Sequence, residues 1–192
     1  MEQQRSKGLL TVVLPAYNEE ASVPKAARVL ASLLAQEDIP FELMFIDDGS
    51  RDGTWKAIQA QTKEDPRVRG VRFSRNFGKE AAIFAGLAQA RGDCVAVMDC
   101  DLQHPPEKVP EMCRLWQQGY QVVEGVKASR GKENPLHGLG ARGFYAVISR
   151  ATGIDMSRAS DFKLLDRRAV DVLLAMREKN AFFRALSSWI GF

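Results

Sequence analysis

The stretch Val95-Ala-Val-Met-Asp-Cys-Asp-Leu-Gln-His-Pro-Pro-Glu107 joins an apolar run to an acidic motif and then to two prolines. The apolar run predicts a buried strand, and Asp99 and Asp101 follow at its carboxyl end. Two carboxylates there can hold a divalent cation, which proteins usually bind between a few carboxylates and substrate phosphates. The prolines end the strand and can open a helix, because proline is tolerated in a first helical turn. The stretch therefore predicts a strand–helix unit with a metal–diphosphate site at its junction.

Short apolar runs and helical patterns alternate along the rest of the chain. They predict strands at 9–14, 41–46, 68–73, 94–98 and 122–126, and helices at 20–35, 54–62, 79–90 and 107–118. A polar loop at 127–137, a helix at 139–151, an unassigned segment at 161–165 and a helix at 167–176 follow. Nearly all-apolar strands are typical of parallel sheets covered on both faces. The pattern predicts an α/β fold with one Rossmann-like, mostly parallel sheet and helices on both faces.

Composition indicates one globular domain and excludes several classes of partner. The 192 residues are 45% hydrophobic and 27% charged, which suits one domain with a sizeable core. A net charge of +3 with dispersed basic residues gives no support for nucleic-acid binding. Three cysteines without C-x-x-C spacing or a secretory pattern favour a reduced, cytosolic compartment. The sequence contains no apolar run of about eighteen residues, the length that a membrane-spanning helix needs.

Three further polar clusters lie at the carboxyl ends of predicted strands, where ligands bind in sheets of this kind. They are Pro15-Ala-Tyr-Asn-Glu19, Asp47-Asp-Gly-Ser50 and Arg75-Asn-Phe-Gly-Lys79. Ordinary turns explain much of them, with Asn18 as a helix cap in the first. Capping does not explain Asp48, a second carboxylate still attached to its strand, which could hold a ribose or a base.

Three later features stay open on spacing alone. Asp161 is either a cap or turn residue, or an extra carboxylate for the metal site. The stretch 138–143 matches G-x-G-x-x-G without a preceding strand, so we regard the match as accidental, and Arg142 within it faces solvent or a phosphate. The aromatic-rich segment 181–192 either packs on the core or meets a membrane surface as the end of a cut-down chain.

In order and spacing, these stretches resemble the family 2 glycosyltransferases, which have the GT-A fold. The matching stretches are Pro15–Glu19, Asp47–Ser50, Asn76–Lys79 and Asp99–Glu107. Later stretches, at 126–130, 143–145, 160–167 and 182–192, look like the polyprenyl-phosphate glycosyltransferases, including dolichol-phosphate mannose synthases and bacterial bactoprenol glucosyl transferases. Those proteins continue into an amphipathic region and commonly two transmembrane helices. We therefore expect residues 1–192 to be the GT-A catalytic domain of a longer protein.

The resemblance implies a role for each candidate residue, grouped by the substrate or cofactor that it would meet. The donor, a nucleotide sugar, would be held by Pro15, Tyr17, Glu19, Asp48, Lys79 and Asp99. Asp101 and Gln103 would bind Mg2+ or Mn2+, and Arg130 and Arg142 would meet the acceptor phosphate. Asp161 would stand at the reacting centre, so Asp161 and Asp101 are the candidate catalytic residues.

The resemblance also implies an activity, an inverting transfer from UDP-glucose to a polyprenyl (undecaprenyl) phosphate at the cytoplasmic face of the bacterial inner membrane. The C-terminal end would meet the membrane surface, and a homo-oligomer is compatible with the pattern. The second pKa of a phosphate monoester is about 6, so a lipid phosphate is largely ionised near neutral pH. We therefore expect Asp161 to orient the acceptor or sugar more than to remove a proton.

Two alternatives remain open. One is a soluble family 2 transferase acting on a glycan hydroxyl, which requires a true base. The other is a nucleotide-sugar-binding module without turnover.

Overall fold

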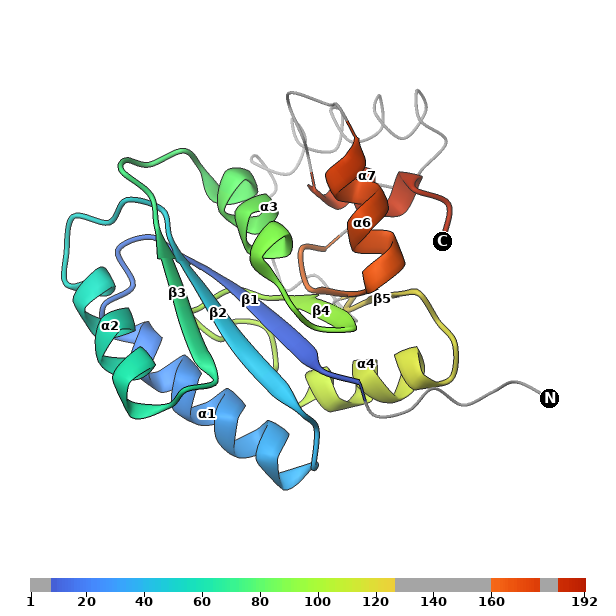
Figure 1. Cartoon of the computed structure of the whole chain (residues 1–192), viewed down its shortest axis with the longest axis horizontal. Coiled ribbons are helices and arrows are strands. Elements are labelled where there is room, and N and C mark those ends of the chain that lie inside the picture. The colour runs from blue at the N-terminus through green and yellow to red at the C-terminus, as the bar shows by residue number, and fades with distance from the viewer. Residues whose placement is uncertain (1–7, 127–159, 177–182) are drawn as a thin grey trace, which may run out of the picture.

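Six strands form one sheet in the order β3-β2-β1-β4-β6-β5 (Figure 1). The computed structural model describes residues 8–126, 160–176 and 183–192. The strands are β1 (Leu10–Ala16), β2 (Phe41–Asp47), β3 (Val68–Arg72), β4 (Cys94–Val97), β5 (Val122–Glu124) and β6 (Lys163–Asp166). The loop expected at 127–137, the helix expected at 139–151, and both Arg130 and Arg142 lie outside the described residues.

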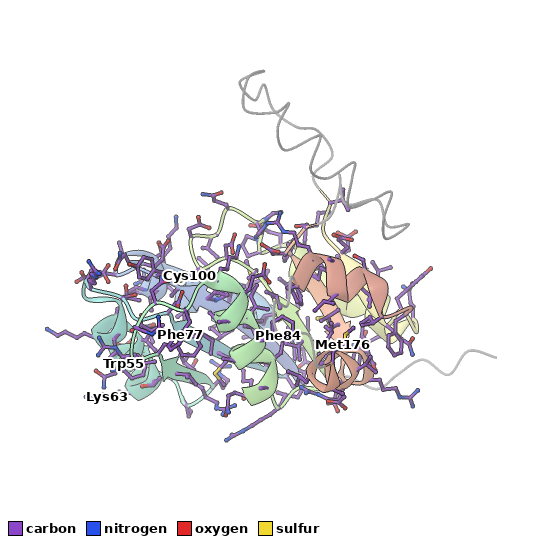
Figure 2. All side chains as sticks on the ribbon, turned by 90° about the horizontal axis from the view of Figure 1, so that it is seen from above. Trp55, Lys63, Phe77, Phe84, Cys100 and Met176 are labelled. Carbon is purple, nitrogen blue, oxygen red and sulfur yellow. The ribbon has the colours of Figure 1, made fainter. Side chains whose placement is uncertain are left out.

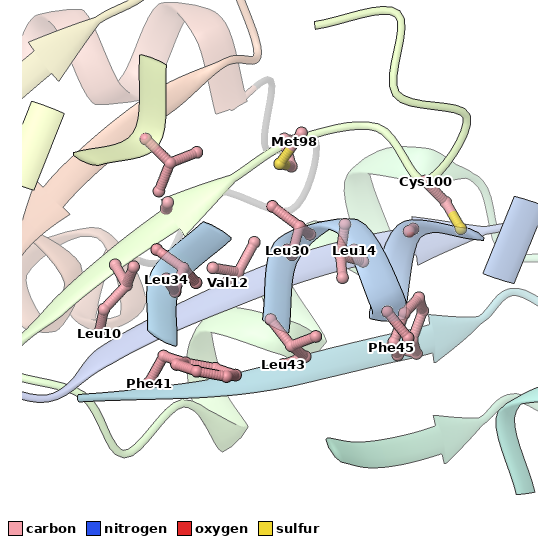
Figure 3. Close-up of a cluster of buried hydrophobic side chains, with 14 of the residues drawn as sticks. Leu10, Val12, Leu14, Leu30, Leu34, Phe41, Leu43, Phe45, Met98 and Cys100 are labelled. Carbon is pink, nitrogen blue, oxygen red and sulfur yellow. The ribbon is translucent and has the colours of Figure 1, made fainter. Parts of the chain in front are cut away.

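Helices cover both faces of the sheet, as the sequence predicts (Figure 1). On one face lie α1 (Ser22–Gln36), α2 (Thr54–Glu64) and α4 (Lys108–Gln117); on the other lie α3 (Lys79–Gln89), α6 (Arg167–Ala175) and α7 (Phe183–Trp189). Successive strand side chains point to opposite faces. Val12 and Leu14 accordingly pack with α1 (Figure 3). Val13 instead packs with α3 on the other face.

The sheet is mostly parallel, with two antiparallel pairings at one side. Strands β3, β2, β1 and β4 run parallel, whereas β6 runs antiparallel to both β4 and β5. The register pairs Val97 with Lys163, which places the start of β6 beside the end of β4. The sequence pattern does not predict β6, because Lys163 interrupts the apolar run at 161–165 that would otherwise indicate a strand. In the structure Lys163 is fully buried.

The C-terminal helix α7 packs on the core. Phe183 is fully buried, and its ring meets that of Phe84 edge-on, with 6.4 Å between centroids. Phe84 lies on the side of α3 that faces α6 and α7 (Figure 2). The core-packing alternative for the end of the chain is therefore confirmed for α7 and Ile190, whereas Gly191 and Phe192 are exposed. None of the helices in the described ranges combines the length and apolar character that crossing a membrane requires.

We predict that Gly86→Ala lowers the free energy of unfolding, although alanine is the better helix former. A methyl group at Gly86 would collide with Val13 Cγ1, and a β-branched valine has little rotamer freedom to move away. Overpacking of this kind costs about 1–3 kcal/mol, more than the helix-propensity gain of about 1 kcal/mol. Urea denaturation measures the change.

Val13→Ala supplies the matched control for this collision. If the collision is the cause, the Gly86→Ala/Val13→Ala double variant is more stable than the two single effects predict when summed. A Gly86→Ala variant as stable as the unmodified protein would contradict the packing argument.

Candidate active site

Hydrogen bonds from backbone N–H groups to side-chain oxygens join the loops that follow β1 and β2. The N–H groups of Asn18 and Glu19 donate to Ser50 Oγ (2.9 Å) and Thr54 Oγ1 (2.7 Å). In return, Arg51 N–H donates to Asn18 Oδ1 at 3.0 Å. The expectation that Asn18 caps a helix is wrong, since its side chain bridges the loops and does not cap α1. Its φ of 56° is a left-handed conformation that asparagine adopts more readily than most residues.

Asp48 holds a third loop in place at the same edge of the sheet. Its carboxylate is buried and accepts hydrogen bonds from Phe77 N–H (2.7 Å) and Gly78 N–H (2.9 Å), just before α3 begins. Asp48 thus shapes the turn that delivers Lys79 to the site. On the neighbouring β1 loop, 42% of Tyr17 is exposed. The donor contacts predicted for these residues stay predictions.

Four charged side chains form a chain of alternating sign, which we call the charge chain: Asp99, Lys79, Asp161 and Arg184. Lys79 Nζ lies 2.6 Å from Asp99 Oδ1 and 3.0 Å from Asp161 Oδ2. Arg184 donates two hydrogen bonds to the Asp161 carboxylate, from Nε to Oδ1 at 2.6 Å and from Nη2 to Oδ2 at 2.7 Å. Three residues predicted for the site, Lys79, Asp99 and Asp161, therefore lie in one continuous ionic contact.

The charge chain keeps Lys79 and Asp161 ionised. Burial alone would raise the pKa of Asp161, but hydrogen bonds from Arg184 and the charge of Lys79 lower that pKa below its usual value. Burial opposes the charge on Lys79, yet Asp99 and Asp161 raise the pKa of its ammonium group. Next to Lys79, Glu80 has a raised pKa because of burial. At neutral pH Asp161 is thus a weak base and a persistent negative charge.

The acidic motif divides its side chains between the core and the site. Cys100 is buried within the core (Figure 3), whereas Asp99 and Asp101 on either side of it are half-exposed. Asp101 Oδ1 accepts a hydrogen bond from Gln103 N–H at 3.0 Å, across Leu102 with a φ of 59°. This tight turn holds Asp101 and Gln103 close together in an accessible position.

The donor chemistry of Asp101 and Gln103 fits Mg2+ or Mn2+. A carboxylate and a side-chain amide offer hard oxygen ligands, and a bound diphosphate can complete the coordination. Across residues 8–126, 160–176 and 183–192, no three side chains of the His, Cys, Asp and Glu types are grouped for metal binding. A cation here would therefore depend on substrate oxygens for much of its coordination.

His104 lies between the acidic motif and the segment that precedes β6. Its ring stacks on Phe162, with 5.0 Å between centroids, and its Nδ1 lies 4.0 Å from Asp99 Oδ2. Phe162 also fills the space above Gly125, where a side chain would collide with the ring. The segment after β4 and the segment before β6 are thus packed together next to Asp99.

Sequence reasoning missed two cations, Arg184 and Lys163. Lys163 Nζ is fully buried, donates to Ser187 Oγ (2.8 Å) and Ser188 Oγ (3.0 Å), and lies 3.5 Å from Glu124 Oε1. Burial lowers the pKa of Lys163. In the sequence, Lys163 and Arg184 each stand as a single cation inside an apolar segment. This pattern indicates that each cation needs a partner, but it does not identify the partner.

The sequence model of the family described as Glycosyl transferase family 2 matches residues 11–174. The chain belongs to this family. Among curated relatives, an uncharacterized glycosyltransferase, YkcC of Bacillus subtilis (strain 168), is 39% identical over 95% of this chain and 57% of its own length. The bactoprenol glucosyl transferase of Shigella phage SfV is 34% identical over 95% of this chain and 60% of its own length. The chain thus spans 57% to 60% of the length of these two relatives.

Solved glycosyltransferases share the GT-A fold of this chain. Glucosyl-3-phosphoglycerate synthase from Mycobacterium tuberculosis, in complex with UDP, is 27% identical with a TM-score of 0.63, covering 88% of this chain and 60% of that one. A mannosyltransferase from Pyrobaculum calidifontis, in complex with GDP-Man and Mn2+, is 20% identical with a TM-score of 0.57. That match covers 90% of this chain and 48% of the other, and it supports the fold alone.

We predict that Asp161 stabilises the protein in a pH-dependent way. A folded-state pKa below the unfolded value of about 3.9 means that the stabilisation is present above that pH and is lost as the pH falls through the folded pKa. The difference in unfolding free energy between the unmodified protein and Asp161→Asn should therefore be largest at about pH 6–7 and shrink below about pH 4. Denaturant titrations across this range measure it.

Asp171→Asn provides the matched control, because this exposed carboxylate lies 3.6 Å from Arg167 on the surface of α6. Its substitution should change stability by less than about 1 kcal/mol. A difference for Asp161→Asn that is as small as the control at every pH would contradict the prediction.

Proposed function

We propose that the chain is the catalytic domain of an inverting glycosyltransferase that moves a sugar from UDP-glucose to a polyprenyl phosphate, undecaprenyl phosphate in the first instance. One observation carries the proposal: Asp99, Asp101 and Asp161 gather at one edge of a GT-A sheet, in a chain that belongs to family 2. Its similarity to a bactoprenol glucosyl transferase supports the lipid acceptor, and the UDP-bound neighbour supports the nucleotide.

The donor is bound by the strand-end loops in this proposal. The nucleoside is faced by Pro15 at the end of β1, by Tyr17 and Glu19 in the loop that follows, and by Asp48 directly after β2. Asp99 faces the ribose or sugar. Asp101 and Gln103 would hold Mg2+ or Mn2+, and the bound cation would supply positive charge to the leaving diphosphate. Lys79, which contacts Asp99, adds a positive charge next to the proposed donor site.

The acceptor needs little help to become a nucleophile, because a lipid phosphate is already largely ionised near neutral pH. The lowered pKa of Asp161 suits a residue that orients a reactant better than one that takes up a proton. Arg130 and Arg142, outside the described residues, are the proposed ligands of the acceptor phosphate. We place the reaction at the cytoplasmic face of a bacterial inner membrane, reached through the C-terminal end.

We predict that UDP-sugars with Mn2+ raise the melting temperature more than GDP-sugars do, and that EDTA removes most of the gain. Ligand at about 100 times its Kd adds about 2.7 kcal/mol of stability, which a thermal-shift assay resolves. Asp101→Asn should lose the metal-dependent gain without changing the melting temperature of the free protein. Glu111→Gln, at an exposed carboxylate on α4, is the control that keeps it. An unchanged melting temperature with every nucleotide and nucleotide sugar would contradict the proposed function.

We predict transfer from labelled UDP-glucose to polyprenyl phosphate by the full-length protein, and none to glycan acceptors. Asp161→Asn should lower kcat about 10- to 100-fold, the range expected when a reactant is misplaced. Asp171→Asn should leave kcat unchanged. Activity of Asp161→Asn close to that of the unmodified protein would remove Asp161 from the chemistry.

Other outcomes favour the alternatives. Transfer to a glycan hydroxyl, with a loss of about 10²- to 10⁴-fold in Asp161→Asn, would indicate a soluble transferase with a true base. Metal-dependent nucleotide binding without transfer to either acceptor would indicate a binding module.

A further inference from the structure

Helix α7 reaches the candidate active site through one side chain, Arg184. Its guanidinium meets Asp161 through two parallel contacts, and the Asp161 side chain is only 5% exposed. Among the described residues, Oδ1 of Asp161 receives a hydrogen bond only from Arg184, whereas Oδ2 is shared between Arg184 and Lys79. Paired contacts of this kind fix the plane of a carboxylate, which one ammonium contact does not.

The backbone that carries Arg184 is itself fixed on two sides. Towards α3, Phe183 N–H donates to Glu80 Oε2 at 2.8 Å, and the Phe183 ring is buried. Towards β6, the Lys163 ammonium donates to the hydroxyls of Ser187 and Ser188 and lies 3.4 Å from the carbonyl oxygen of Arg184. The position of the guanidinium therefore follows from how α7 docks on the sheet.

We propose that Arg184 is a positioning residue of the transferase, which holds the Asp161 carboxylate in the orientation that sugar transfer needs. The inference rests on the proposed function, since it takes Asp161 to face the acceptor or the sugar. Helix α7 then has two roles: it covers the apolar face of α3 and α6, and it sets the geometry of the reaction centre. A lysine at 184 would keep the charge but lose the paired contact.

The charged groups around Asp161 give the proposal an electrostatic signature. Lys79 and Glu80 face it from α3, Arg184 from α7 and Lys163 from β6. Without Arg184, the carboxylate keeps Lys79 as its direct partner and stays near the negative charges of Asp99 and Glu80. The pKa of Asp161 should then rise. As the pH is lowered, any activity that needs an ionised Asp161 should therefore be lost at a higher pH than in the unmodified protein.

The test is a double-mutant cycle on kcat in the full-length protein, comparing the unmodified protein with Arg184→Gln, Asp161→Asn and the double variant. Arg184→Gln should lower kcat about 10- to 100-fold, with KM for the UDP-sugar within about threefold of its original value. In the Asp161→Asn background the same change should alter kcat by less than about threefold. Independent, multiplicative losses would overturn the positioning role.

Two further readouts separate positioning from a purely structural role. The acid limb of the kcat profile should move to higher pH in Arg184→Gln, and Arg184→Lys should bring it part of the way back. Arg168→Gln removes an exposed arginine from α6 and should change neither kcat nor the limb. If Arg184→Gln fails to fold, the cycle is run with Arg184→Lys. A stability loss with an unmoved acid limb would overturn the proposal.

The cycle is run with whichever acceptor the unmodified protein uses. Transfer to a glycan only would contradict the proposed function and leave the cycle readable, and coupling there would still support the positioning role. Multiplicative losses in a protein that transfers to polyprenyl phosphate would overturn the positioning role alone. A protein without turnover on any acceptor would overturn both.

Discussion

The antiparallel pairing of β4 with β6 is the contact on which the candidate site depends. Parallel neighbours bring carboxyl ends together, whereas an antiparallel neighbour brings its beginning to the same edge. With Val97 opposite Lys163, the chain before β6 meets the chain after β4, and Lys79 reaches both Asp99 and Asp161. A slip of one residue would turn Lys163 toward the opposite face of the sheet and shift Asp161 just before it. Helix α7 would then lose its ion pair with Asp161 and its hydrogen bonds from Lys163.

Burial makes these ionic contacts more specific than those on the surface. An exposed pair such as Lys108 with Glu111 contributes about 0–1 kcal/mol. Removing one partner of a buried pair costs about 3–5 kcal/mol, because the other charge is left without compensation. If α7 left its position, Asp161 would lose Arg184 and keep only Lys79 among its described partners. Lys163 would lose the Ser187 and Ser188 hydroxyls and keep only Glu124. These buried charges therefore favour the docked position of α7. Burial of Phe183 stabilises the packing of α7 on the core. The contacts with Asp161 and Lys163 determine the position in which α7 docks.

The sequence predicts the parts of the fold and site that depend on local pattern. Apolar runs ending in polar clusters are enough to locate four parallel strands and to gather Asp48 and Asp99 at one edge. Strand β6 escapes prediction because Lys163 breaks its apolar run, and nothing local reveals that Ser187 and Ser188 will receive that lysine's hydrogen bonds. The Arg184 contact with Asp161 has no local signal either, since docking of α7 creates it.

The two halves of the site differ in how much of the chain each one needs. The donor half is built from consecutive strand–helix units: residues about thirty positions apart close the β1 and β2 loops and tie Asp48 to the turn before α3. The reaction half joins α3 to a helix 103 positions later through the contact between Glu80 and Phe183, and it closes only when β6 and α7 are in place. Nucleotide binding therefore depends on the first half of the fold, whereas the orientation of Asp161 depends on the last. A change confined to α7 should accordingly affect turnover before it affects donor affinity, because no residue proposed to bind the donor lies on that helix.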